Sequence, residues 1–217
     1  MTSRSCPDMD RCRRSAKSVA ATLMCPTPRS HTDAVYRRVC QSDYAALAAL
    51  QEANLRDNLT KAQRSEGFLS ARFSREQFAA MDAGVAVVVA EVDGLIAGYL
   101  CGSSVEFNRR FALLVAMIER YPHTSLRGRP LQSYTSFVYG PVCVDRRFRG
   151  RGLLRGLYRR LRAEAAGKFE IGVAFVAQDN AHSLAAHVQG LGMCDAGSFE
   201  FDARRYRILA FEVEEKA

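Results

Sequence analysis

The sequence lacks any apolar run of the length, about 18 residues, that a membrane-spanning helix requires. Its longest apolar run, Gly84–Ala90, has only the length of a β-strand. The first 33 residues also lack the continuous apolar stretch of a secretory signal. We therefore predict a chain with no membrane partner.

The sequence also lacks a cysteine pattern that would organise a metal site or a set of disulfides. It has seven cysteines, an odd number, and no two of them have CxxC spacing. Cys101 and Cys143 lie in apolar, strand-like runs, where a free thiol packs as a small apolar group. We therefore predict no bound metal and a reducing, cytoplasmic compartment.

Residues 1–33 differ in composition from the rest of the chain. They are rich in Arg and Ser, contain three cysteines and show little hydrophobic periodicity. We predict a disordered basic tail over this segment. A mitochondrial transit peptide is an alternative, against which Asp8, Asp10 and Asp33 argue. Residues 34–217 are long enough to form one domain with its own core.

The net charge of +8 is concentrated in one stretch of the chain. From Arg146 to Arg162 there are eight arginines with no acidic residue among them. Such a block is usually a solvated face, but it also suits a partner that carries phosphate. A nucleic-acid-binding protein is therefore one alternative, although no recognition motif for nucleic acid accompanies the arginines.

Hydrophobic periodicity predicts strands interleaved with helices, the pattern of a mixed α/β sheet. The predicted strands are Ala34–Cys40, Val85–Glu91, Leu95–Val105, Ser133–Val144, Ile171–Val176, Gly197–Phe201 and Tyr206–Val213. The predicted helices are Asp43–Asn58, Ser74–Ala83, Phe107–Arg120, Leu153–Ala166 and Asn180–Gln189. We expect a single α/β domain with a mixed central sheet of about six to seven strands, flanked by helices.

Short sequence signals refine this scheme. Ser42 is the predicted N-cap of the first helix, and Ser74–Gln77 has the pattern of a capping box. Asp93-Gly94 predicts a tight hairpin turn. Gly140-Pro141 interrupts the strand Ser133–Val144, and because proline cannot donate to a sheet ladder, we expect a bulge there.

One segment carries a chemical signal: a strand ends at Val144, an Arg- and Gly-rich turn follows, and an amphipathic helix begins at Leu153. The N-terminus of such a helix presents unpaired N–H groups and a positive dipole end, which together favour an anion. Gly150 and Gly152 let the backbone approach a ligand closely. A dinucleotide fingerprint fails because Arg155 stands where it needs glycine, and the Walker sequence is absent.

The segment resembles the pyrophosphate-binding motif of the GNAT superfamily of N-acetyltransferases, Arg/Gln-x-x-Gly-x-Gly/Ala. In one register Arg149, Gly150 and Gly152 align to the "RGxG" form of the motif and Leu154 takes the final small position; in another, Arg147 is the first residue. The resemblance implies that the pyrophosphate of acetyl-CoA would be held by backbone N–H groups of Arg149, Gly150, Arg151, Gly152, Leu153 and Leu154. It also implies that Val142, Cys143 and Val144 would line the pantetheine arm, where the sheet splays at Gly140-Pro141.

A second segment is similar to another element of that family, N-x-x-S/A-x-x-x-Y/H-x-x-x-G. It begins at Asn180 and continues through Ser183 and His187. The resemblance implies that Asn180 and Ser183 contact the cofactor arm, and that His187 lies near the CoA sulfur as a general acid. From the residues alone, Asn180 is equally a helix N-cap and His187 a packed core residue.

The resemblance, which extends over about residues 34–213, implies direct attack of an acceptor amine on the acetyl thioester. No carboxylate lies within Ser133–Val144 to accept the amine proton, so Glu106, Glu91 and Tyr139 are the candidate bases, acting through water. Covalent catalysis by Cys143 is less favoured because the strand pattern predicts its burial. A small-molecule or peptide amine is the expected acceptor. A GNAT-like domain that binds acyl-CoA without catalysis and a homodimeric state are both left open.

Overall fold

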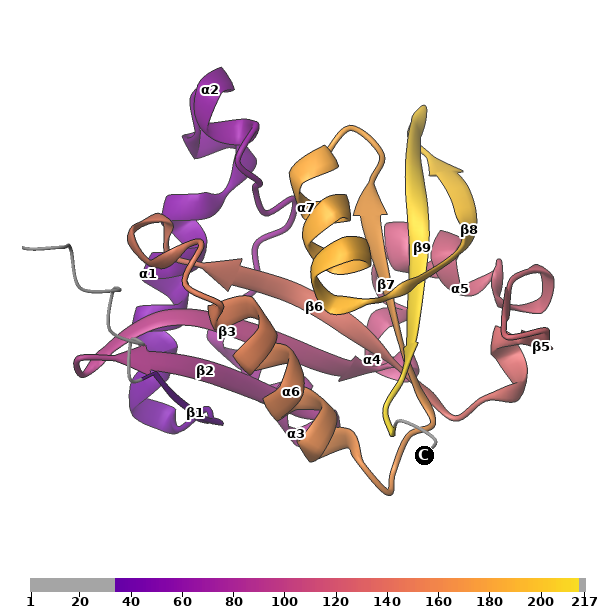
Figure 1. Cartoon of the computed structure of the whole chain (residues 1–217), viewed down its shortest axis with the longest axis horizontal. Coiled ribbons are helices and arrows are strands. Elements are labelled where there is room, and N and C mark those ends of the chain that lie inside the picture. The colour runs from indigo at the N-terminus through magenta and orange to yellow at the C-terminus, as the bar shows by residue number, and fades with distance from the viewer. Residues whose placement is uncertain (1–33, 215–217) are drawn as a thin grey trace, which may run out of the picture. The chain divides into compact units, whose positions relative to one another are not determined.

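The computed structural model describes residues 34–214, so the predicted tail at 1–33 lies outside the described residues. Seven strands form one sheet: β1 (Val35–Arg38), β2 (Ala86–Val92), β3 (Leu95–Ser104), β6 (Ser136–Val144), β7 (Ile171–Ala177), β8 (Cys194–Phe201) and β9 (Arg204–Glu212). Their order is β1-β2-β3-β6-β7-β9-β8 (Figure 1). Only β6 and β7 pair in parallel in this sheet, which confirms the predicted mixed α/β fold.

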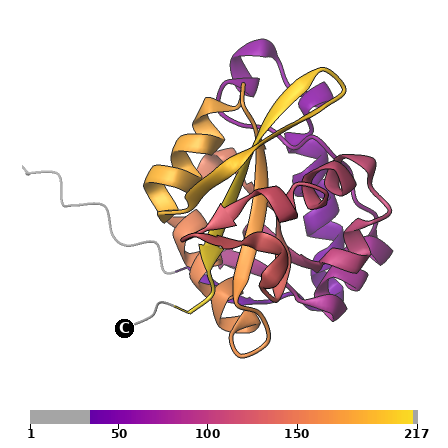
Figure 2. The same ribbon diagram turned by 90° about the vertical axis from the view of Figure 1, so that its right-hand side faces the viewer.

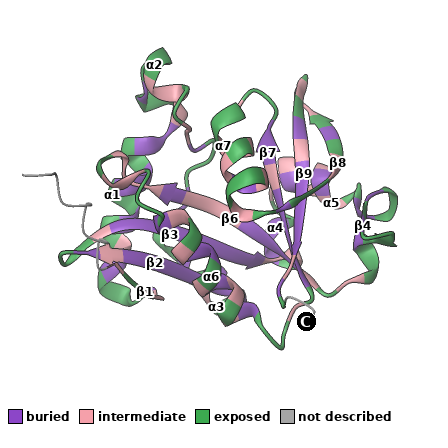
Figure 3. Cartoon of the chain, viewed as in Figure 1, coloured by how far each residue is buried: buried purple, intermediate pink, exposed green. Residues whose placement is uncertain are grey.

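The strands β2 and β3 form the most deeply buried part of the sheet (Figure 3). Val87, Val88 and Val89 have no exposed surface. Helices cover both faces of the sheet, so the side chains that point to either face meet apolar neighbours. The predicted hairpin turn is confirmed: Asp93 and Gly94 have φ of 51° and 77°, and Val92 pairs with Leu95.

Helices lie on both sides of the sheet, as the view in Figure 2 shows. One side carries α1 (Tyr44–Asn54) and α3 (Arg75–Gly84), and the other carries α6 (Leu153–Ala165) and α7 (Ala181–Ala185). The α6 stripe is buried as predicted, with Leu153, Leu157, Tyr158, Leu161 and Ala165 facing inward. No helix among residues 34–214 combines the length and apolar character needed to span a membrane.

The predicted helix Phe107–Arg120 is wrong as a single element. The structure has two short helices, α4 (Val105–Asn108) and α5 (Ala112–Ile118). The buried Asn108 amide donates to Ser103 Oγ at 2.8 Å and to the Ser104 carbonyl at 2.7 Å, while Phe111 takes an extended conformation. The break has a packing reason: Phe107 belongs to the core under α1 and α3, whereas α5 packs on the β7–β9 side.

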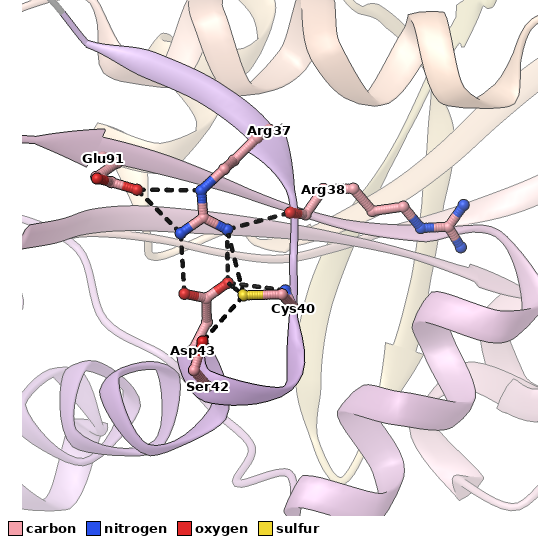
Figure 4. A network of polar contacts seen from close by, with 6 residues as sticks. All are labelled: Arg37, Arg38, Cys40, Ser42, Asp43 and Glu91. Atoms are coloured by element: carbon pink, nitrogen blue, oxygen red, sulfur yellow. Dashed lines mark hydrogen bonds and ion pairs between the residues drawn. The ribbon is translucent and has the colours of Figure 1, made fainter. Parts of the chain in front are cut away.

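The predicted N-cap at Ser42 is also wrong, because the chain makes a 3₁₀ turn over Gln41–Asp43 before α1 begins. Asp43 takes the N-cap position of α1 without a side-chain bond into that helix, and its carboxylate instead accepts from the Cys40 N–H at 2.8 Å, at the start of the 3₁₀ turn (Figure 4). Arg37 holds the same carboxylate at 2.7 Å and Glu91 at 2.9 Å. The Arg37 hydrogen bond lowers the pKa of Asp43 to about 2, so the ionised carboxylate is a stronger acceptor than a serine hydroxyl.

The sheet splits in the middle, between β6 and β7. These strands pair only from Ser136–Val138 to Ile171–Val173. The next residues of β6, Gly140-Pro141, add one residue opposite β3, where the register shifts between Leu100 and Gly102. The predicted bulge is therefore confirmed, and Val142–Val144 pair with β3 alone.

A test of the packing behind this split is Gly172→Ala on β7. A Cβ there would lie 2.2 Å from Phe211 Cζ and 2.9 Å from Phe137 Cζ, and both rings are buried. We expect a loss of about 2 kcal/mol in the free energy of unfolding, measured by urea denaturation. Gly190→Ala is the control, since its Cβ would meet nothing closer than 4.0 Å. Equal stabilities for the two variants would contradict the packing described.

Candidate functional site

A cleft of about 400 Å³ lies where β6 and β7 have parted. Three of its walls come from the end of β6, from the turn that leads into α6, and from α7 with the π-helical turn that continues it, Ala186–Gly190. The fourth wall is the segment Glu66–Leu69, which follows the short helix α2 (Lys61–Arg64). The cleft thus joins parts of the chain that are distant in sequence.

The predicted cofactor-binding residues gather in this cleft. Those that line it are Val142, Cys143, Val144, Arg149, Gly150, Gly152, Leu153, Leu154, Asn180 and Ser183. Arg151 is the exception: it is not part of the lining, and its guanidinium lies over the Phe148 ring, 5.3 Å from the centroid.

The backbone of β6 presents hydrogen-bonding groups to the cleft. The Asp145 N–H donates to the Ala97 carbonyl of the neighbouring strand β3 at 2.8 Å, so Asp145 and Cys143 direct their backbone groups toward β3. Val142 and Val144 alternate with them and therefore direct theirs toward the cleft, where pairing with β7 has ended. Such a free strand edge can pair with an extended polar ligand.

The N-terminus of α6 also opens onto the cleft. Gly152 is its N-cap with φ of 82°, Gly150 has φ of 73°, and no side chain of the described chain caps this helix. By contrast, Ser74 caps α3 and Asn180 caps α7. The first N–H groups of α6 are thus left for an anion, which the helix dipole also favours.

Two arginines of the turn are held by protein groups. Arg149 donates to the Val144 carbonyl at 3.1 Å, to the Glu66 carbonyl at 2.9 Å and to Asn54 Oδ1 at 2.9 Å. Burial lowers the pKa of Arg149 from its ordinary value. Arg146 pairs with the Glu66 carboxylate at 2.8 Å. The guanidinium of Arg149 therefore organises the cleft wall, while the backbone of the turn stays open to a ligand.

Asn180 both caps the helix α7 and lines the cleft. Its Oδ1 accepts from the Ser183 N–H at 3.2 Å, so the capping interpretation is confirmed. The same residue lines the cleft. Capping fixes the side chain on the cleft wall.

His187 lines the cleft and forms a buried pair with Tyr139, which is not part of the lining; each has 4% of its surface exposed. Tyr139 Oη lies 3.2 Å from His187 Nε2, and His187 Nδ1 lies 2.7 Å from the Ser183 carbonyl oxygen. A carbonyl only accepts, so Nδ1 carries the proton and Nε2 accepts from the Tyr139 hydroxyl. Burial lowers the pKa of His187 and raises that of Tyr139, so both groups are neutral near pH 7.

The structure places the remaining candidate catalytic residues as follows. The Glu106 side chain is 86% exposed beside Arg109 and is not part of the cleft lining. Glu91 lies on β2, where its carboxylate forms an ion pair with Arg37 at 2.9 Å. Cys143 lines the cleft, but burial raises the pKa of its thiol to about 12, which keeps it protonated and a poor nucleophile.

Sequence reasoning missed one wall of the cleft. Asn54, at the end of α1, and the segment Glu66–Leu69 carry no periodicity or motif that marks them. Their role depends on contacts with the turn before α6, chiefly those of Arg149. A pairing over more than 80 residues of chain leaves no local signal in the sequence.

Comparisons with known proteins agree with this geometry. The family model described as the acetyltransferase (GNAT) family matches residues 48–193. No curated protein matches the chain in sequence. The match to the family model spans the whole cleft, from α1 to the end of the π-helical turn.

Solved structures share the fold at low sequence identity. The protein smu.2055 of Streptococcus mutans is 15% identical with a TM-score of 0.57, over 83% of this chain and 99% of its own. The protein yncA of Salmonella typhimurium, solved with its cofactor acetyl-CoA, is 20% identical with a TM-score of 0.53, over 85% and 96%. The ribosomal-protein-alanine N-acetyltransferase of Brucella melitensis is 19% identical with a TM-score of 0.54, over 82% and 99%.

Proposed function

The chain belongs to the acetyltransferase (GNAT) family, and we propose that it transfers the acetyl group of acetyl-CoA to a primary amine. One observation carries this proposal: the free edge of β6 and the uncapped N-terminus of α6 face the same cleft. An extended, partly amide-like arm that ends in a pyrophosphate suits this combination. Acetyl-CoA has that form, and it would supply an activated thioester.

The residues of the chain would divide the binding between them. Backbone N–H groups from Arg149 to Leu154 would hold the pyrophosphate, since two glycines with positive φ and the helix terminus converge there. Val142 and Val144 would pair with the pantetheine arm through their backbone groups, while Asn180 and Ser183 border it from α7. Strand N–H groups near the bulge would polarise the acyl carbonyl.

The Tyr139–His187 pair is the proposed proton source for the leaving thiolate. As the amine nitrogen bonds to the acyl carbon and the C–S bond breaks, the sulfur keeps the electron pair and takes up a proton from the pair. The proton that the amine loses on forming the amide would restore the pair to its neutral state. The proton between Tyr139 Oη and His187 Nε2 belongs to the Tyr139 hydroxyl. The neutral imidazole carries only one proton, and this proton is on Nδ1, which donates it to the Ser183 carbonyl. We therefore revise the expected general acid from His187 alone to the pair.

Thermal stability with and without acetyl-CoA tests the proposal. A ligand at 100 times its Kd that binds only the folded state adds about 2.7 kcal/mol, a shift of several degrees in Tm for a chain of this size. Thiol release should then be measured with a panel of amines, amino acids and peptides that includes an N-terminal alanyl peptide. No shift at millimolar acetyl-CoA would contradict the proposal.

A second candidate function is acyl-CoA binding without transfer. It is favoured by one observation: in the described part of the chain, the only carboxylate on the cleft lining is Glu66, and Arg146 holds it. The same hydrogen bond lowers the pKa of Glu66, which makes it a weak base. Saturable binding without thiol release across the panel would favour this function over transfer.

A further inference from the structure

Glu66 stands out on the cleft wall because it is an acid beside a site suited to an anion. Its Oε2 accepts from Arg146 Nη2 at 2.8 Å and from Arg146 Nε at 3.2 Å. The same oxygen lies 3.8 Å from Arg149 Nη1. The Glu66 carboxylate thus pairs with Arg146 and lies near Arg149, two of the arginines of the turn that leads into α6.

The residues around Glu66 reach across the mouth of the cleft. Gly67, with φ of 100°, turns the chain after α2, and a Cβ on it would lie 3.7 Å from His182 Nδ1 on α7. Figure 1 shows the chain after α2 arriving beside α7. Residues 65–68, which we name the strap, therefore connect the Arg149 side of the cleft to the α7 side.

Two arginines hold the strap at Glu66: Arg149 donates to its backbone carbonyl at 2.9 Å, and Arg146 pairs with its carboxylate at 2.8 Å. The second contact is of a kind that a stronger anion can replace. The Glu66 side chain is 57% exposed, and ion pairs of such exposed groups are weak. A pyrophosphate carries more charge than a carboxylate, and guanidinium groups bind phosphate oxygens strongly and in a bidentate way. Glu66 and Arg149 line the cleft whereas Arg146 does not, so a pyrophosphate in the cleft would meet the Glu66 carboxylate next to Arg149.

We propose that Glu66 is an internal competitor for the phosphate groups of CoA: in the free protein its carboxylate pairs with Arg146 and lies 3.8 Å from Arg149, and the incoming pyrophosphate displaces the carboxylate and loosens the strap, which Arg149 still holds at the Glu66 carbonyl. This inference rests on the proposed function, since it takes CoA as the ligand of the cleft. Glu66 is then a positioning residue that sets cofactor affinity and links cofactor binding to the mobility of the strap.

The test is the affinity of Glu66→Gln for CoA, measured by calorimetry at low salt. We expect about three- to tenfold tighter binding than in the wild type, because one repulsive charge and one competing ion pair are lost. Glu52→Gln is the matched control: Glu52 is 51% exposed and pairs with Arg72 at 2.8 Å, outside the cleft lining. Pantetheine, which has no phosphate, should bind both variants and the wild type equally.

Hydrogen exchange supplies a second readout. Amides of the strap should exchange faster in the wild type with CoA than without it, and equally fast in free Glu66→Gln. Unchanged or weaker CoA binding by Glu66→Gln, or a strap more protected with CoA, would overturn the inference while leaving the proposed function intact. A wild type that binds no CoA would instead remove the proposed function, and the inference with it.

Discussion

Gly152→Glu should bind acetyl-CoA at least about 100-fold more weakly than the wild type. Gly152 is the N-cap of α6, and its φ of 82° costs an L-residue about 1 kcal/mol. No atom lies within 4 Å of a Cβ at this position, so the new side chain does not clash. Its carboxylate would instead sit at the positive end of the helix, where it repels a pyrophosphate and competes for the same N–H groups.

The matched control is Gly128→Glu in the turn between β4 (Ser125–Leu126) and β5 (Arg129–Pro130). Gly128 has φ of 80° and equally open surroundings, but it lies outside the cleft lining. Both variants should lose similar stability in urea, while only Gly152→Glu loses the thermal shift with acetyl-CoA. If Gly152→Glu keeps the wild-type affinity, the pyrophosphate is not held at this helix terminus.

Tyr139→Phe should lower kcat by about ten- to 100-fold, with little change in KM for acetyl-CoA. The substitution keeps the buried ring and removes the hydroxyl that donates to His187 Nε2 at 3.2 Å. Steady-state thiol release measures the effect. Tyr121→Phe is the control, since Tyr121 is also buried and its hydroxyl has no hydrogen-bond partner among the described residues. Equal kcat values for the two variants would remove Tyr139 from the reaction.

The buried His187 of the Tyr139–His187 pair should make the folding stability of the protein depend on pH. Burial holds the pKa of folded His187 below its ordinary value of 6.5, so the unfolded chain takes up its proton first as the pH falls. Folding stability should therefore decline from about pH 6.5 downward until the folded imidazole also titrates. His187→Gln should show a shallower decline in urea titrations between pH 7 and 5. A decline as steep as that of the wild type would mean that other groups cause it.

Local sequence determined much of this fold. The β-branched run Val85–Glu91 is buried on both faces, and the α6 stripe lies inward as its period of 3.6 predicts. The capping box at Ser74 and the turn at Asp93-Gly94 formed as predicted. These features depend on residues within one or two turns of each other, so the sequence alone is enough to predict them.

The prediction failed where local signals competed with packing. The apolar residues of 107–120 have helical spacing, yet the chain breaks because its two halves pack in different cores. Ser42 has good capping chemistry, but a 3₁₀ turn precedes α1, and Asp43 in that turn bonds to Arg37 and to the Cys40 N–H. Packing against elements far away in sequence decided the first case, and hydrogen bonds among nearby residues decided the second.

The cleft likewise combines features that local sequence predicts with features that depend on contacts in the folded chain. Local sequence was enough to predict the Arg149–Leu154 turn and the position of Asn180, because glycine turns at a helix start and helix capping need residues at fixed short spacing. Tertiary contacts alone bring Glu66 to Arg146 and Tyr139 to His187, 48 positions away. Hydrogen bonds and ion pairs of this kind form between chain segments that the sheet brings together, and the split between β6 and β7 is what gives them a common cleft.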